Sequence, residues 1–97
     1  MIFSSKKVRE YILGGARYVA TIRRAGLYRE GQRVELKLGD KRLKGKVIKV
    51  VPLERARGYL HISGFSSLEE WLSEAKRLHK VNDLDGFEVV VVRVERS

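Results

Sequence analysis

The stretch that decides the fold is FEVVVVRVER, residues 87–96 of a 97-residue chain. Four consecutive valines are typical of a strand that is covered on both faces, because a strand with one wet face alternates apolar and polar residues. A strand covered on both faces belongs in the middle of a sheet. We therefore expect residues 87–96 to form a central strand.

The segment before this strand predicts the clearest helix of the chain. Residues 66–80 begin with two serines, each followed three residues later by a glutamate, which is the capping-box pattern. The apolar residues that recur at helical spacing are Leu68, Trp71, Leu72, Ala75 and Leu78. We expect Trp71 to be a core residue and His79, in the last turn, to bind carbonyl groups at the helix end.

The first half of the chain predicts one short helix and three strands. Ser5 can cap a helix over residues 6–13, and the Gly14–Gly15 pair can end it. Residues 34–38 alternate apolar and charged side chains, which indicates a strand with one wet face. The predicted strands are residues 17–24, 34–38 and 43–53; the last two form a hairpin, Gly45 marks a bulge or bend, and residues 54–64 are irregular.

The order of these elements is helix, three strands, helix and strand, without the βαβ alternation that a parallel sheet requires. This order indicates the α+β class. The glycine within the long strand favours a small, partly closed β-barrel flanked by two helices. The length of the chain and the absence of a linker composition predict a single domain over residues 1–97.

The charge of the chain narrows the classes of partner. Lys and Arg number 21 against 12 Asp and Glu, a net charge of +9, which attracts nucleic acids or anionic membrane surfaces. There is no cysteine, and His61 and His79 lie far apart, so we expect no metal site and no cofactor. No segment has the apolar length of a signal peptide or a membrane span, so we expect a cytoplasmic protein without a membrane partner. The abundance of charged residues is typical of proteins from hot environments.

Several motifs occur in the order found in one known family. They are ILGGARYVATIR (12–23), LYREGQRVELKLGDKRLKGKVIKVVPL (27–53), GFSSLEEWLSEAKRLH (64–79) and the valine-rich last strand. Together, over nearly the whole chain, they resemble the ASCH domain of the PUA-like superfamily. The resemblance implies a small β-barrel with a cleft beside the glycine–strand junction, and RNA binding linked to RNA metabolism or translation. Some members of that family deacylate acetylated cytidine, and ribonuclease activity has been proposed for others.

The catalytic groups of the deacylating branch are mostly missing here. Thr21 occupies the position of the family threonine, but Tyr18 stands where those enzymes have a lysine, with Arg17 one residue earlier. An arginine cannot act as a base at neutral pH. Residues 61–65 contain no carboxylate where the resemblance would place a glutamate. The pattern favours an RNA-binding module; the alternatives are a small hydrolase or ribonuclease that uses Thr21, and a protein-interaction module.

Strand alternation sorts the side chains of residues 17–24 onto two faces. Arg17, Thr21 and Arg23 share one face, which we expect to line a cleft for a phosphate or a flipped-out base edge; the other face is mostly apolar and points to the core. The hairpin lysines serve as edge protection or as phosphate contacts. Tyrosines near the cleft are candidates for base stacking. The predicted RNA-binding residues are Arg17, Tyr18, Thr21, Arg23, Tyr28, Lys44, Lys46, Arg55 and Arg57.

Overall fold

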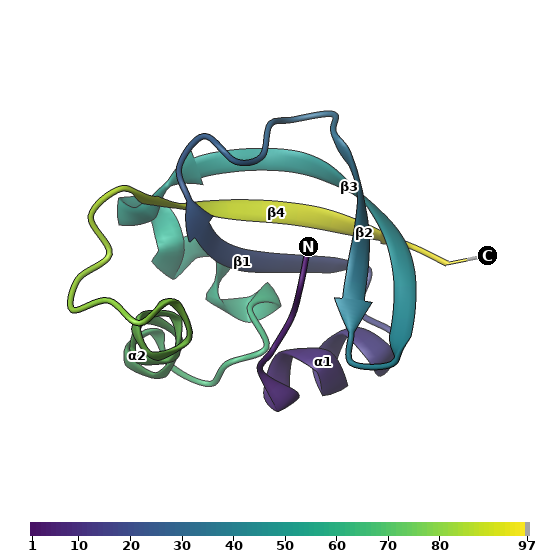
Figure 1. Cartoon of the computed structure of the whole chain (residues 1–97), viewed down its shortest axis with the longest axis horizontal. Coiled ribbons are helices and arrows are strands. Elements are labelled where there is room, and N and C mark those ends of the chain that lie inside the picture. Colours follow the sequence, from purple (N-terminus) through teal and green to yellow (C-terminus); the bar gives the residue numbers. More distant parts are fainter. Residues whose placement is uncertain (97) are drawn as a thin grey trace.

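A four-stranded antiparallel sheet and three helices make up residues 1–96, the part of the chain that the computed structural model describes (Figure 1). The helices are α1 (Lys6–Leu13), η1 (Leu53–Ile62), which has 3₁₀ geometry, and α2 (Leu68–His79). The strands are β1 (Tyr18–Arg24), β2 (Arg33–Leu38), β3 (Lys41–Pro52) and β4 (Phe87–Glu95). The α+β class is confirmed, and the predicted helices and strands lie within two residues of these bounds.

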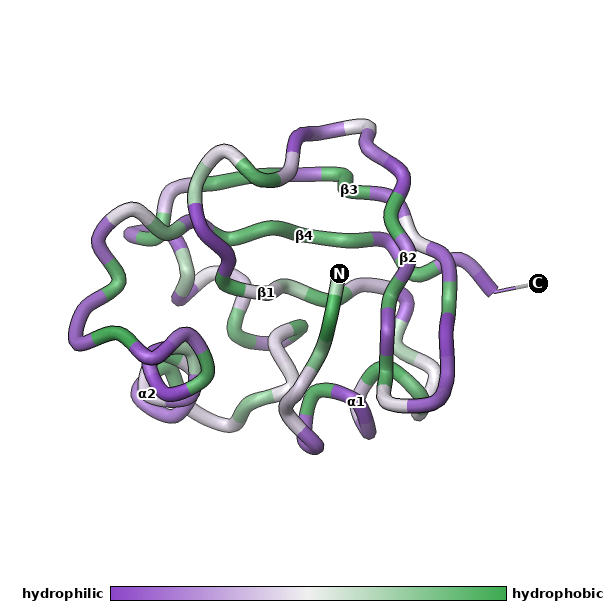
Figure 2. The backbone as a smooth tube through the Cα atoms, viewed as in Figure 1, coloured by the Kyte–Doolittle hydropathy of each residue, from purple (hydrophilic) through white to green (hydrophobic). Residues whose placement is uncertain are grey.

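The valine-rich segment is the central strand, as expected. The strand order is β1-β4-β3-β2, so β4 pairs with β1 on one side and with β3 on the other. All four valines, Val89–Val92, are buried, and Figure 2 shows β4 as hydrophobic over most of its length. Because successive side chains of a strand point to opposite faces, this burial requires cover on both sides of the sheet.

Two separate cores provide that cover. One core lies between the sheet, α1 and the N-terminal segment, residues 1–5; the other lies between the sheet, η1 and α2. β1 contributes Val19 to the first core, and Ala20 and Ile22 to the second. Our expectation that only one face of β1 is apolar is therefore wrong, because helices cover both faces. Trp71 is buried in the second core, as predicted.

The sheet is open, so the partly closed barrel that we expected does not form among residues 1–96. β1 and β2 are the two edges, and the N-terminal segment lies between them. The N–H of Phe3 donates to the carbonyl of Lys37 on β2 at 3.0 Å, and the N–H of Lys37 donates to the carbonyl of Met1 at 2.8 Å. From β1, the guanidinium of Arg23 donates to the carbonyl of Ile2 at 2.7 Å. Main chain and one arginine thus occupy the place where a barrel would pair its edge strands.

The starts of α1 and α2 agree with the sequence prediction, whereas the segment before α2 does not. The Oγ of Ser67 accepts a hydrogen bond from the N–H of Glu70 at 3.1 Å, and the Glu70 carboxylate accepts one from the N–H of Ser66 at 3.0 Å. Ser5 occupies the N-cap position of α1, without a side-chain capping bond. Residues 53–62, most of which we expected to be irregular, instead form η1, which packs in the same core as α2.

The glycine of β3 has a different role from the one predicted. The bulge in this strand lies between Val47 and Lys49, beyond Gly45. A Cβ atom added to Gly45 would lie 2.7 Å from Cγ1 of Val92 and 3.1 Å from the carbonyl oxygen of Arg93. Real side chains do not approach that closely, so β3 can pass β4 at this point only without a side chain.

Candidate functional site

Four of the predicted site residues divide between two hollows. Thr21 and Arg23 line a cavity of about 290 Å³ beside β1, which we call the β1 cavity. Arg17 and Tyr18 border a separate, shallow hollow at the other end of the strand, next to Arg93. The expectation that Arg17 shares a cleft with Thr21 and Arg23 is therefore wrong. Four residues of extended chain separate Arg17 from Thr21 by about 13 Å, enough to place them in different surroundings.

The β1 cavity is framed by the N-terminal segment, α1 and α2, which lie beside β1, an edge strand of the sheet (Figure 1). Its apolar lining includes Phe3, Val8, Ala20, Phe65, Trp71 and Leu78. Among its polar groups, Ser63 is fully buried; its Oγ donates to the carbonyl of Leu60 at 2.7 Å and accepts from the N–H of Phe65 at 3.1 Å. This hydroxyl is thus occupied in holding the turn before α2.

Arg23 is the cation of the β1 cavity, and its partners Thr21, Ile2 and Phe3 are neutral. Its Nε donates to Oγ1 of Thr21 at 3.1 Å, and a terminal nitrogen donates to the carbonyl of Ile2 at 2.7 Å. The guanidinium carbon lies 4.9 Å from the centre of the Phe3 ring, a cation–π contact. Burial lowers the pKa of the Arg23 guanidinium, because a low-dielectric site disfavours the charged form. Arg23 therefore joins β1 to the N-terminal segment.

His79, at the end of α2, contacts the edge of β1. Its Nε2 lies 3.2 Å from the carbonyl oxygen of Ile22, and its ring meets the ring of Phe87 edge-on with 4.8 Å between centroids. The predicted contact with carbonyls of its own helix is thus replaced by one to a neighbouring strand. α2 is closed instead by Lys80, whose left-handed backbone (φ 57°) lets its N–H reach the last turn.

The second region is the half of the sheet that η1 and α2 leave uncovered. The strand register sets Arg33, Lys46, Arg93 and Tyr18 directly opposite one another on β2, β3, β4 and β1, so that the four side chains share one face. Lys44 lies in the next row of the same face. Tyr18 is 41% exposed. We call this surface the cationic face; it consists of Tyr18, Arg33, Lys44, Lys46 and Arg93.

Two glutamates partly compensate the positive charge of the cationic face. Glu95 lies 3.0 Å from a terminal nitrogen of Arg33 and 4.0 Å from one of Arg93. Glu35 lies 3.1 Å from Arg42 at the neighbouring position. All of these pairs are exposed to water, so each contributes little to stability. The lysines of this face that form no ion pair within residues 1–96 are Lys44 and Lys46.

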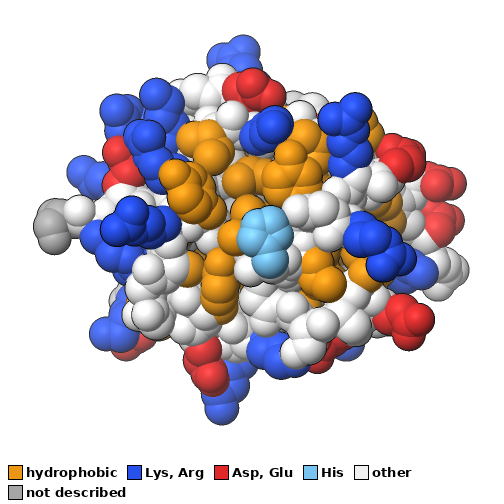
Figure 3. Space-filling view, turned by 180° about the vertical axis from the view of Figure 1, so that it is seen from behind, with side chains coloured by type: hydrophobic (Ala, Val, Ile, Leu, Met, Phe, Trp, Pro, Cys, Tyr) orange, Lys and Arg blue, Asp and Glu red, His pale blue; other side chains and the backbone are white. Residues whose placement is uncertain are grey.

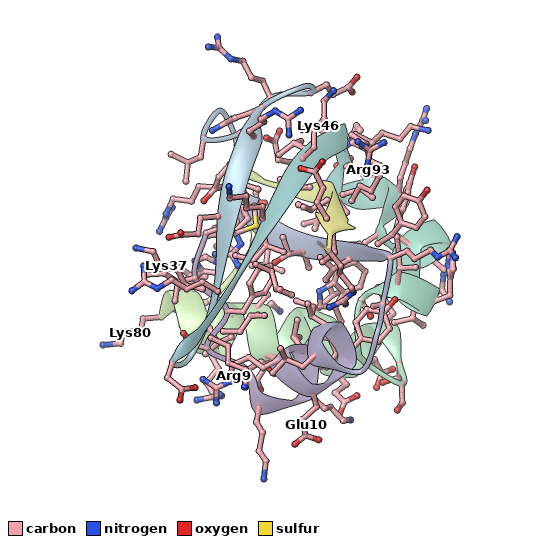
Figure 4. The ribbon with its side chains drawn as sticks, turned by 90° about the vertical axis from the view of Figure 1, so that its right-hand side faces the viewer. Arg9, Glu10, Lys37, Lys46, Lys80 and Arg93 are labelled. Atoms are coloured by element: carbon pink, nitrogen blue, oxygen red, sulfur yellow. The ribbon has the colours of Figure 1, made fainter. Side chains whose placement is uncertain are left out.

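The views from two sides show how this charge is arranged. In Figure 3, Lys and Arg side chains gather on the left, the end of the sheet that lies at the right in Figure 1. Figure 4 shows Lys46 and Arg93 close together, far from Lys80. Two shallow hollows, of about 560 and 350 Å³, meet at Arg96. The guanidinium of Arg96 donates to the carbonyls of Ile12 and Ala16 and so ties the end of the chain to α1.

The remaining predicted residues lie away from both hollows. Tyr28 is half-buried and packs against the first core. Arg55 and Arg57 are exposed on η1, and Arg57 borders a hollow between η1 and α2. The sequence prediction missed Arg33 and Arg93, although Arg93 is the one charged residue that interrupts the valine-rich strand. That interruption was the available signal for an uncovered stretch of β4.

Two structural findings bear on other classes of site. No helix within residues 1–96 is long and apolar enough to cross a membrane. The His, Asp and Glu side chains of the described residues form no group of three that could hold a metal ion.

The fold and the two hollows define a small α+β protein with an open, antiparallel sheet and a cationic sheet face. Protein 105 of Sulfolobus islandicus rod-shaped virus 1, an uncharacterized protein, is 45% identical to this chain over 100 residues, which span 100% of this chain and 95% of the viral protein. The chain belongs to the family of this viral protein. Neither a protein-family model nor a solved structure matches this chain.

Proposed function

We propose that this protein is an RNA-binding module and that the cationic face is its RNA-binding surface. The observation that carries the proposal is the row of Arg33, Lys46 and Arg93 on adjacent strands, ending at the exposed ring of Tyr18. Strands in a sheet lie about 4.8 Å apart, so the row extends over roughly 14 Å. A positive strip of this length beside an exposed aromatic ring suits a single strand of nucleic acid.

Two further observations support RNA as the partner. The net charge of +9 favours association with polyanions. The order of the sequence motifs resembles the ASCH domain, whose members are expected to bind RNA. In this proposal the cationic face takes the place of the cleft that we expected around Thr21.

A hydrolase that uses Thr21 has less support. The Thr21 hydroxyl accepts a hydrogen bond from Arg23, and no Asp, Glu or Lys occurs among the described residues that line the β1 cavity. His79 is the only common general base in that lining, and its Nε2 is in contact with the carbonyl of Ile22. No group is therefore placed to activate the threonine.

The test is fluorescence anisotropy of a labelled single-stranded RNA and a labelled duplex RNA over a series of salt concentrations. The variant Lys46→Glu/Arg93→Glu should weaken RNA binding on the order of 10- to 100-fold. It should also reduce the slope of log K against log salt concentration by the amount expected for about two phosphate contacts. The matched control is Lys76→Glu/Lys80→Glu, at the end of α2, which changes the net charge equally. Equal losses in the two variants would show non-specific attraction, and a wild type without measurable, salt-dependent affinity would refute the proposal.

A further inference from the structure

The β1 cavity combines an apolar wall with one cation, a different composition from that of the cationic face. Its volume of about 290 Å³ is close to the lower limit of ~300 Å³ for small-molecule pockets. At ~30 Å³ for each non-hydrogen atom, as in liquid water, it holds a ligand of roughly ten such atoms. Ile2 (60% exposed) and Leu78 (38% exposed) line it as well, so the cavity is reached from solvent between the N-terminal segment and α2.

The charge of Arg23 lacks a counter-ion in this cavity. No ion pair involves Arg23 within residues 1–96, and its hydrogen bonds to Thr21 and Ile2 use only part of its five N–H donors. A half-buried cation among neutral partners is stabilised by an anion that reaches its free donors. The cavity therefore offers a place for one negative group.

The apolar wall of the cavity indicates which kind of ligand would bear that negative group. Phe65, Trp71 and Leu78 line the same cavity as Arg23, and no acidic residue is found among the described residues of the lining. A phosphate group usually binds where several cations or N–H groups converge, whereas a carboxylate is satisfied by one guanidinium in bidentate geometry. One cation facing aromatic and aliphatic side chains matches a carboxylate on a small apolar body.

We propose that the β1 cavity binds a small amphiphilic carboxylate, a molecule with one carboxylate and an aromatic or aliphatic body of roughly ten non-hydrogen atoms. The carboxylate accepts hydrogen bonds from the free N–H groups of Arg23. The body lies against Phe65, Trp71 and Leu78. This site is separate from the cationic face, so it is independent of the RNA-binding proposal.

The single tryptophan of the chain makes the test direct, because Trp71 lines the cavity and reports on its occupancy. Phenylpropionate, phenylpropanol and phenylpropylamine share one apolar body and differ in the charge of the head group. Each is titrated against the protein by tryptophan fluorescence and by calorimetry. We expect the acid to bind about tenfold or more tightly than the alcohol, since charge-assisted hydrogen bonds are the stronger ones. The amine should bind most weakly.

Three variants make this test specific. Arg23→Met should remove the preference for the acid over the alcohol, and Arg23→Lys should restore part of it. The control Arg24→Met alters the next residue, which stacks on Phe87 outside the cavity, and should leave binding unchanged. Ala75→Leu, which fills the cavity from α2, should abolish binding of all three compounds. Circular dichroism confirms that each variant is folded.

Several results would overturn the proposal. Acid and alcohol of equal affinity would show that Arg23 does not select an anion. Absence of binding at millimolar concentrations would show that the cavity is not a ligand site for this chemistry. Uridine monophosphate that binds more tightly than phenylpropionate, and loses this affinity in Arg23→Met, would identify the cavity as a nucleotide pocket instead.

Loss of RNA binding in Lys46→Glu/Arg93→Glu with unchanged phenylpropionate binding would confirm that the two sites are separate.

Discussion

The two hollowed regions of this molecule hold their cations in opposite ways. In the β1 cavity a single arginine, Arg23, lies among neutral and apolar groups, and its geometry is fixed by Thr21, Ile2 and Phe3. On the cationic face four Lys and Arg side chains lie close together in water, and within residues 1–96 only Arg33 and Arg93 of the four lie within ion-pair distance of a glutamate, Glu95. A fixed, half-buried charge can select a small ligand by shape, whereas a wide exposed field attracts a polyanion and weakens with salt.

The largest difference between the two regions should appear in stability. Trp71→Ala removes a buried ring from the wall of the β1 cavity and should cost about 3–5 kcal/mol of unfolding free energy. Arg33→Ala removes an exposed ion pair from the cationic face and should cost no more than ~1 kcal/mol. Urea unfolding followed by far-ultraviolet circular dichroism measures both. Similar costs for the two variants would contradict the division into a structural and a solvated region.

A second prediction concerns the strand that carries the lysines of the cationic face. Gly45→Ala should destabilise the protein by about 1–3 kcal/mol, because the added Cβ meets Val92 and the backbone oxygen of Arg93, and backbone cannot move aside easily. Gly58→Ala, in η1, is the matched control: a Cβ there meets nothing within 4 Å. It should be neutral or stabilising by up to ~1 kcal/mol. A neutral Gly45→Ala in the same urea assay would mean that β3 and β4 are less closely packed than described.

The elements that could be predicted from the sequence are those with a local signal. The run Val89–Val92 predicted a central strand because its pattern needs no knowledge of its neighbours. Ser67 and Glu70 predicted the start of α2 because capping is decided within one turn. η1 has 3₁₀ geometry and neither a strong apolar period nor a side-chain cap, so no local pattern in the sequence predicted this helix.

The site residues were harder to predict because they depend on pairing between distant segments. Arg33, Lys46 and Arg93 lie in one row only through the register of β2, β3 and β4, which a shift of one residue would change. Arg23 was predicted to line a cleft, and it does line the β1 cavity. Its contacts with Ile2 and Phe3 followed from the docking of the N-terminal segment, which has no signature in the sequence.

A third prediction separates stacking from charge on the cationic face. Tyr18→Ala should weaken binding of single-stranded RNA by roughly 1–3 kcal/mol, the usual contribution of one base–aromatic stack. Tyr18→Phe keeps the ring and should bind as the wild type does. The duplex should be nearly indifferent to both changes, because its bases are already stacked. An equal loss for Tyr18→Phe in the anisotropy assay would point to the hydroxyl, and no loss for Tyr18→Ala would leave charge alone as the source of affinity.

The smallest effect should come from the ion pair between the two helices that frame the β1 cavity. Lys7 of α1 donates to the Glu70 carboxylate of α2, and this bond, with that from the N–H of Ser66, lowers the pKa of Glu70. A carboxyl group whose pKa is lower in the folded state stabilises the fold above its unfolded pKa, about 4.3, and loses that contribution as the pH falls through the folded value.

Glu70→Gln should therefore lower the thermal midpoint slightly at pH 7, and the difference from the wild type should shrink at acid pH, as the Glu70 carboxyl gains its proton. Thermal unfolding at a series of pH values measures this difference. The control is Glu69→Gln, at another exposed glutamate in the first turn of α2. It should change the dependence of the thermal midpoint on acid pH less than Glu70→Gln does. If the midpoint of Glu70→Gln differs from the wild type equally at pH 7 and at acid pH, the effect comes from the helix cap. The bond between Lys7 and Glu70 would then contribute nothing through its charge.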